Sequence, residues 1–71
     1  MRFEFSDHAK FRLLERGVST EEVKRTIFKP DTAIRRRDGT VVAGKSFGKH
    51  KLTVVYVTKG KLHIIVTVIK V

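Results

Sequence analysis

The sequence predicts an α+β domain in which a short N-terminal strand and two helices precede a twisted antiparallel β-meander. Three observations support this fold class: apolar and polar residues alternate at the N-terminus, two helix start signals precede Pro30, and the apolar period changes to two after it. At 71 residues the chain has the length of one domain, so residues 1–71 are expected to form a single unit.

The first seventeen residues predict one strand and one helix. Met1–Phe5 alternates apolar and polar side chains, which is typical of a short half-buried strand. Either Ser6 or Asp7 is suited to accept a hydrogen bond from a free amide of the following first turn. The helix is expected over residues 7–16, and Gly17 is placed to end it in the left-handed conformation.

A second helix follows after a very short connection. Ser19 and Glu22 have the spacing of a capping box, in which each side chain bonds the backbone amide at the other position. The helix is expected over residues 20–28, and Pro30 prevents it from continuing.

Beyond Pro30 the sequence predicts strands joined by tight turns, with Asp38-Gly39 as the strongest hairpin signal. The last two strands are apolar on both faces, which predicts central positions or a cover on each side. The first two strands after Pro30 are more polar, which predicts an edge hairpin. Both helices are expected on one face of the sheet. The expected strands are Thr32–Arg37, Thr40–Phe47, His50–Thr58 and Lys61–Val71.

Positive charge dominates the chain. Sixteen Lys and Arg against seven Asp and Glu give a net charge of +9. Residues 1–30 hold seven basic and five acidic residues, whereas residues 31–71 hold nine basic, two acidic and no Glu. A solubility surface usually intersperses both signs, so this imbalance favours a polyanionic partner, single-stranded RNA first among them.

Composition also bears on compartment and chemistry. The absence of cysteine and of any apolar run near the ~20 residues of a membrane span predicts a cytoplasmic protein with no membrane association. Gly44-Lys45-Ser46 lacks the upstream glycine of a P-loop and follows a strand. No cofactor is expected.

The first predicted helix gathers polar groups on one side. On a helical wheel His8, Arg12, Glu15 and Arg16 fall within an arc of about 100°. An imidazole that moves a proton and two guanidiniums that stabilise phosphate charge suit phosphoryl chemistry, so His8, Arg12 and Arg16 are the candidate catalytic residues. The alternative is an ordinary solvated face on which Glu15 pairs with Arg12. Phe11, Leu13 and Leu14 are expected on the other side of this helix.

A second basic group surrounds the predicted edge hairpin. It is either a phosphate clamp, because guanidinium is rigid and bidentate, or a guard against pairing between sheet edges. Alternation sends Arg36 to one face and its two neighbours to the other. The candidate nucleic-acid-binding residues are Arg35, Arg36, Arg37, Lys45, Lys49 and Lys51.

The other histidines and the tyrosine favour structural roles. His63 alternates in step with Thr67 and Ile69, which predicts one mostly apolar face for all three. His50 opens a strand beside two lysines and is expected to be exposed, while Tyr56 is expected to be a packed ring. Three histidines without metal-ligand spacing predict no metal site.

Two strings of residues resemble a known family. Ser6-Asp7-His8-Ala9, Arg12, Glu15-Arg16-Gly17-Val18-Ser19 and Glu22-Val23, followed by Lys29-Pro30-Asp31, resemble a family of small prokaryotic domains of unknown function related to the RelE/ParE toxin superfamily and the BrnT toxins. The resemblance spans nearly the whole chain. It implies helices before a curved antiparallel sheet, metal-independent ribonuclease activity, and a toxin role opposed by an acidic antitoxin.

Within that family the motif highlights His8, Arg12 and Arg16. Relatives with RelE-type chemistry use Arg, Lys and Tyr from the late strands, where this chain offers His63, Thr67 and Lys70. The leading hypothesis is therefore an RNA-directed, metal-independent endoribonuclease of the toxin type. The alternatives are a non-catalytic basic module that binds RNA, DNA or an acidic protein, and a toxin-fold protein that grips one protein target.

Overall fold

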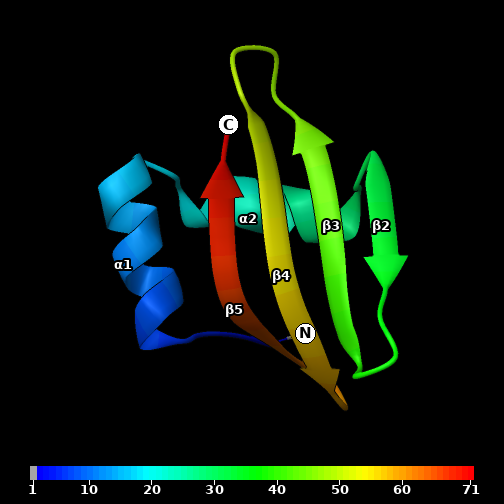
Figure 1. Cartoon of the computed structure of the whole chain (residues 1–71). Helices are drawn as coiled ribbons and strands as arrows, with labels where there is room; N and C mark the ends of the chain where they lie inside the picture. The colour runs from blue at the N-terminus through cyan, green and yellow to red at the C-terminus, as the bar shows by residue number, and fades with distance from the viewer. Residues whose placement is uncertain (1) are drawn as a thin grey trace.

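A computed structural model describes residues 2–71. Five strands form one sheet in the order β1-β5-β4-β3-β2, and two helices lie on one of its faces (Figure 1). The elements are β1 (Arg2–Phe5), α1 (Asp7–Arg16), α2 (Thr20–Phe28), β2 (Thr32–Arg35), β3 (Thr40–Ser46), β4 (Lys51–Lys59) and β5 (Leu62–Lys70). The predicted fold class and both helix boundaries are confirmed.

Both helices begin and end at the signals identified in the sequence. Ser6, not Asp7, caps α1 by accepting from the Ala9 amide, and Gly17 ends the helix with φ 64°. Ser19 and Glu22 form the complete capping box of α2. These local hydrogen bonds satisfy the amides that each first turn leaves free, and for that reason the helix starts are readable from the sequence.

The sheet is antiparallel except at one edge. β2, β3, β4 and β5 follow one another as hairpins, whereas β1 pairs with β5 in parallel. The central position of β4 and β5, expected from their apolar character, is confirmed. The parallel pairing was not predicted, because four residues with one alternation carry no information about strand direction.

β2 is shorter than predicted. It ends at Arg35 rather than Arg37, since Arg36 and Arg37 belong to the turn before β3. The Arg36 amide donates to the Thr40 carbonyl, and the Gly39 amide donates back to the Arg36 carbonyl. Because Arg36 makes these hydrogen bonds of the turn, the alternation of side chains between the two sheet faces, expected through all three arginines, stops at Arg35.

A β-bulge in β5 contradicts the prediction of which β5 side chains lie on which face of the sheet. Val55 pairs with Thr67 and Tyr56 pairs with Ile65, so Val66 is the extra residue. The bulge reverses the alternation, as one inserted residue must. His63 and Ile65 therefore share the helix-covered face with Val68, whereas Thr67 lies on the opposite face.

The core lies between the helices and one face of the sheet. α1 packs on β5 and β1, while α2 packs on β4 and β3. Of the three apolar side chains of α1 that lie away from the polar arc, only Leu13 faces the core; Phe11 and Leu14 are 59% and 84% exposed. The small Ala9 takes the central place instead, because it allows the helix to approach the sheet closely. The core cluster comprises Ala9, Leu13, Val18, Val23, Ile27, Leu52, Val54, Ile65 and Val68.

Candidate nucleic-acid interface

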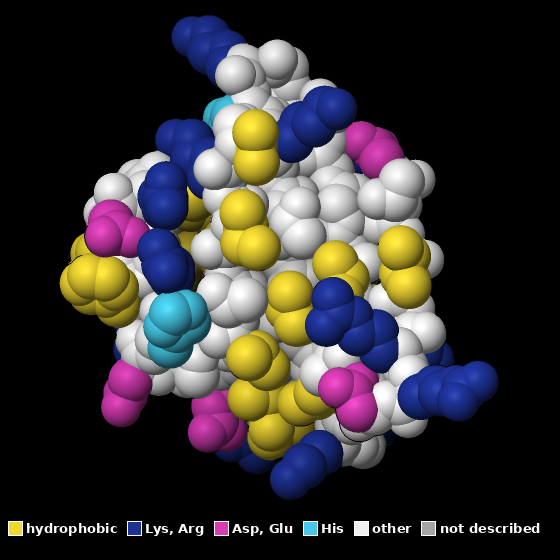
Figure 2. All heavy atoms as spheres, viewed as in Figure 1, with side chains coloured by type: hydrophobic (Ala, Val, Ile, Leu, Met, Phe, Trp, Pro, Cys, Tyr) yellow, Lys and Arg dark blue, Asp and Glu magenta, His cyan; other side chains and the backbone are white. Residues whose placement is uncertain are grey.

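The sheet face opposite the helices, here called the open face, is not covered by any element of residues 2–71 (Figure 1). The strand register places on it the apolar side chains of Ile34, Val42, Val55, Val57, Leu62, Ile64 and Ile69. Figure 2 shows hydrophobic side chains running down the middle of this face with basic side chains around them. The two strands predicted to be apolar on both faces, β4 and β5, thus have one face against the core and the other on the open face.

Hydroxyl groups and one glycine interrupt the apolar surface toward the end of the sheet near the β3–β4 turn. Thr32, Gly44 and Thr53 lie side by side across β2, β3 and β4. A hollow of about 270 Å³ is present there. It is lined by Asp31, Thr32, Gly44, Lys45, Ser46, Lys51, Leu52 and Thr53.

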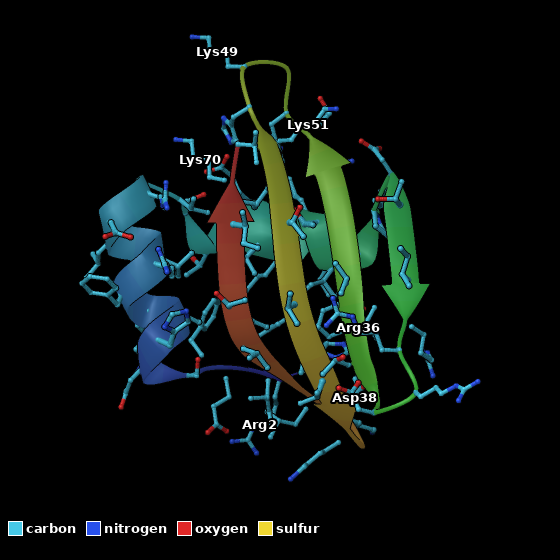
Figure 3. All side chains as sticks on the ribbon, in the orientation of Figure 1. Arg2, Arg36, Asp38, Lys49, Lys51 and Lys70 are labelled. Carbon is cyan, nitrogen blue, oxygen red and sulfur yellow. The ribbon has the colours of Figure 1, made fainter. Side chains whose placement is uncertain are left out.

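Basic residues border the open face. Arg36 lies over β3 from the β2–β3 turn, and Lys51 stands at the start of β4 near the hollow (Figure 3). Lys49 extends from the tip of the β3–β4 hairpin, and Arg2 lies at the opposite end of the sheet (Figure 3). Acidic side chains lie among these basic ones (Figure 2), but Lys and Arg outnumber Asp and Glu sixteen to seven, and this excess attracts a phosphate backbone.

The six predicted nucleic-acid-binding residues do not form one cluster. The register places Arg35 opposite Val41 and therefore on the helix side, while Arg37 is an exposed turn residue. The Lys45 ammonium donates to the Lys29 carbonyl at 2.9 Å. Of the six, Arg36, Lys49 and Lys51 remain at or around the open face, and Lys45 contributes to the lining of the hollow while its ammonium is bonded to Lys29. Strand alternation divides neighbouring residues between the two faces.

The polar side of α1 lies along the β5 border of the open face. His8 Nε2 is 3.1 Å from the Thr67 hydroxyl. Arg12 Nη1 lies 3.0 Å from Glu15 Oε1, and Arg16 Nε lies 3.7 Å from the same oxygen. The structure therefore contains both the arc of functional groups and the Glu15–Arg12 pair that was its alternative interpretation.

The bulge in β5 holds α1 at this border. The Ser6 hydroxyl donates to the carbonyl of the bulge residue, Val66, and the Ser6 amide donates to the Ile65 carbonyl. The next residue, Thr67, contacts His8. One short segment of β5 thus determines where the candidate catalytic imidazole sits.

His8 and Arg16 stand at opposite ends of the α1 arc. At 1.5 Å per residue their backbones are about 12 Å apart along the helix axis, whereas Arg12 lies about 6 Å from His8. His8 and Arg12 can therefore approach one phosphate, and Arg16 is placed for a neighbouring one.

Lys70 is a border residue that sequence reasoning did not select as a site residue. Its ammonium donates to the Arg16 carbonyl at 3.1 Å, at the C-terminal end of α1, where a cation is favoured by the helix dipole (Figure 3). The sequence showed only that a lysine lies near the end of the last predicted strand. Only the packing of α1 against β5 brings it to Arg16.

The remaining histidines lie away from the open face. His50 is not exposed as expected: its side chain is 22% exposed, its Nε2 lies 2.8 Å from Glu22 Oε2, and its ring stacks on Phe47. His63 packs with the rings of Phe3 and Tyr56 on the helix side, each centroid at 5.4 Å. Tyr56 is a packed ring, as predicted.

Two carboxyl groups have shifted pKa values. The Ser19 amide, followed by the contacts with His50, lowers the pKa of Glu22 against the opposing effect of burial. Hydrogen bonds from the Thr40 hydroxyl and amide lower the pKa of Asp38. Both groups stabilise turns or caps and lie outside the α1 arc. Residues 2–71 contain no group of three His, Asp or Glu side chains arranged to hold a metal ion.

Fold and surface together define a small α+β domain with two helices on one sheet face and a basic-bordered, exposed second face. The chain belongs to the family described as domain of unknown function DUF4258, whose model matches residues 5–70. No curated protein and no solved structure matches it. Across residues 2–71, no helix is long and apolar enough to cross a membrane.

Proposed function

We propose that the domain binds single-stranded RNA on the open face. The observation that carries this proposal is a sheet face left uncovered by the helices, with an apolar and hydroxyl-bearing centre and a basic perimeter. Exposed bases would contact the aliphatic side chains by burying apolar surface. Arg36, Lys51 and the α1 arginines would neutralise phosphates. A net charge of +9 draws the strand to the domain and makes the binding sensitive to salt.

Paired charge removal tests this proposal. The double variant Arg36→Gln/Lys51→Gln should lower affinity for an oligouridine at 50 mM salt by at least tenfold, measured by fluorescence anisotropy. The matched control Arg25→Gln/Lys29→Gln removes the same charge from exposed positions at the end of α2 and should change affinity by less than threefold. Equal losses in both variants would mean that net charge alone attracts RNA and that the open face is not the interface.

Cleavage of the bound strand is a second candidate function, supported by the position of His8 at the border of the open face beside Thr67. In this proposal the imidazole accepts the proton of a ribose 2′-hydroxyl, whose oxygen attacks the adjacent phosphorus. The bond to the 5′-oxygen breaks, and that oxygen takes up a proton from water, leaving a 2′,3′-cyclic phosphate. Arg12 stabilises the negative charge that builds up on the phosphate, and Arg16 holds its neighbour.

The test is incubation of purified protein with total RNA in the presence of EDTA. Wild-type protein should cut, and His8→Ala should abolish the cutting with little change in affinity or melting temperature. Arg12→Ala should slow cleavage by about 10²–10³-fold, as expected for loss of one donor to transition-state charge. Equal cutting by wild type and both variants would place the activity elsewhere. Tight binding without any cutting would reject the cleavage proposal and support a domain that binds RNA without cutting it.

A toxin role opposed by an acidic antitoxin is part of the same proposal. An acidic protein seated on the open face would complement its basic perimeter and exclude RNA. Competition between the product of the adjacent gene and oligouridine measures this directly. A neighbour that binds without displacing RNA would argue against neutralisation at this face.

A further inference from the structure

We infer that the hollow at Gly44 receives one base of the RNA strand and that Asp31 selects guanine there. This inference rests on the proposed RNA-binding function and adds a base preference to it. The hollow lies on the same sheet face as the proposed path of the strand, next to Lys51.

The hollow has room for a flat ring. Its volume is about 270 Å³, and Gly44 presents bare backbone between two threonines. A Cβ atom at position 44 would lie 2.9 Å from Thr32 Oγ1, so any side chain there must displace Thr32, which lines the hollow. Glycine in a strand often marks a place where another group approaches the backbone closely, and at Gly44 that group is the Thr32 hydroxyl.

Asp31 supplies an acceptor with spare capacity at the rim of the hollow. Its Oδ2 accepts from the Ser46 amide at 2.8 Å, and its Oδ1 lies 4.0 Å from the Lys45 ammonium. The side chain is nevertheless 55% exposed. A carboxylate offers about four lone-pair positions, so both oxygens can still accept further hydrogen bonds.

The chemistry of the four bases decides which one a carboxylate prefers. Guanine presents two adjacent donors, N1–H and N2–H, which match the two oxygens of one carboxylate. Adenine, cytosine and uracil each place a donor beside an acceptor, and that acceptor would face a carboxylate oxygen. The hydroxyls of Thr32 and Thr53 can bond the remaining polar atoms of the base, while Lys51 lies within the lining to meet a phosphate.

The experiment compares four labelled ribo-oligonucleotides: an eight-nucleotide oligouridine and the same strand with one central G, A or C. Wild-type protein should bind the G strand about tenfold more tightly than the other three, in the range of discrimination expected for one good bidentate pair. Because the quantity is a ratio of affinities, general electrostatic attraction cancels.

Two variants test the hollow itself. Asp31→Asn keeps an oxygen for the Ser46 amide and replaces the other with an NH₂ donor, so the G preference should fall to about one while oligouridine is bound at least as well. Gly44→Ala should also remove the preference, because the added methyl displaces Thr32 from its place in the lining of the hollow. Asp38→Asn makes the same charge change at the β2–β3 turn and should keep the tenfold ratio. Melting temperatures confirm that each variant is folded.

The outcomes separate this inference from the proposed function. RNA binding with equal affinity for all four strands would overturn guanine selection and leave the open face as an RNA-binding surface. A G preference that survives both Asp31→Asn and Gly44→Ala would place the selecting group elsewhere. Failure to bind any RNA at low salt would overturn the proposed function itself.

Discussion

At the scale of single residues, Ser6 links a helix cap to the sheet. Its hydroxyl accepts from the Ala9 amide and donates to the Val66 carbonyl, 60 positions away. The first bond starts α1 and the second fastens that start to the bulge in β5. The position of His8 over Thr67 depends on both bonds.

Substitutions at Ser6 separate its two hydrogen bonds. Ser6→Ala loses both and should lower the free energy of unfolding by about 2 kcal/mol, since a lost cap alone typically costs ~1 kcal/mol. Ser6→Thr keeps a hydroxyl and should restore most of that stability. Ser6→Asp can cap the helix but, when ionised, cannot donate to Val66, so at pH 7 it should behave more like alanine than threonine. Urea titrations of the three variants measure the differences. An Asp variant as stable as wild type would show that only the cap matters.

Single residues also limit what the sequence can predict about the site. His8 could be identified from helix spacing without the tertiary structure, because i, i+4 and i+7 positions share a helix face whatever the helix packs against. Lys70 and Thr67 could not be connected to it, since their neighbours are decided by an extra residue in β5. Asp31 and Gly44 became a candidate site only when the register placed Gly44 between two threonines.

At the scale of elements, Glu22 joins α2 to the β3–β4 hairpin. Its carboxylate completes the capping box with Ser19 and bonds His50 just before β4. His50 in turn stacks on Phe47 at the other side of the hairpin. A helix cap and a hairpin turn thus depend on the same charged group.

The stability contributed by the contacts of Glu22 should depend on pH. The pKa of Glu22 is lower in the folded chain than the usual value of about 4.3. The carboxylate therefore contributes its full stability above that usual value and loses it as the pH falls through the folded pKa. Glu22→Ala should reduce stability by about 1–2 kcal/mol at pH 7, which for a domain of this size is roughly 4–16 °C in melting temperature.

The same comparison at pH 3 supplies the check on that cause. The difference between wild type and Glu22→Ala should shrink as the pH falls toward 3, because acid protonates the wild-type carboxyl as the pH passes through its folded pKa. Glu21→Ala removes an equal charge from the same first turn, where Glu21 is exposed, and should cost only a few tenths of a kcal/mol. A pH-independent difference for Glu22→Ala would show that packing, not charge, stabilises the contact.

At the scale of the whole molecule, excess charge and an exposed apolar sheet face occur together. Charge of one sign keeps molecules apart in solution, which offsets the tendency of an exposed apolar face to associate. A polyanion removes that repulsion and brings its own apolar groups. In the free domain the charge repels other copies of the chain and the apolar face favours association. Single-stranded RNA can use both, because its phosphates bind the charge and its bases contact the apolar face.

The salt dependence of wild-type binding measures how many phosphates the surface engages. If about five are neutralised, the slope of log K against log salt is about −3.5, which is roughly 100-fold in affinity between 50 and 200 mM. Isothermal or anisotropy titrations over that range give the slope. A flat dependence would mean that apolar contact dominates and would favour a protein as the natural occupant of the open face.

The sequence by itself determined the elements and their order. Helix caps, turn glycines and the change of apolar period act over a few residues, so they are readable without knowing the fold. The tertiary structure alone decided which faces the strand residues occupy and what lies beside them. The bulge at Val66 and the parallel pairing of β1 each depend on partners elsewhere in the chain. Because one extra strand residue exchanges the two faces of a sheet, the open face, its basic perimeter and the hollow at Gly44 follow from the register.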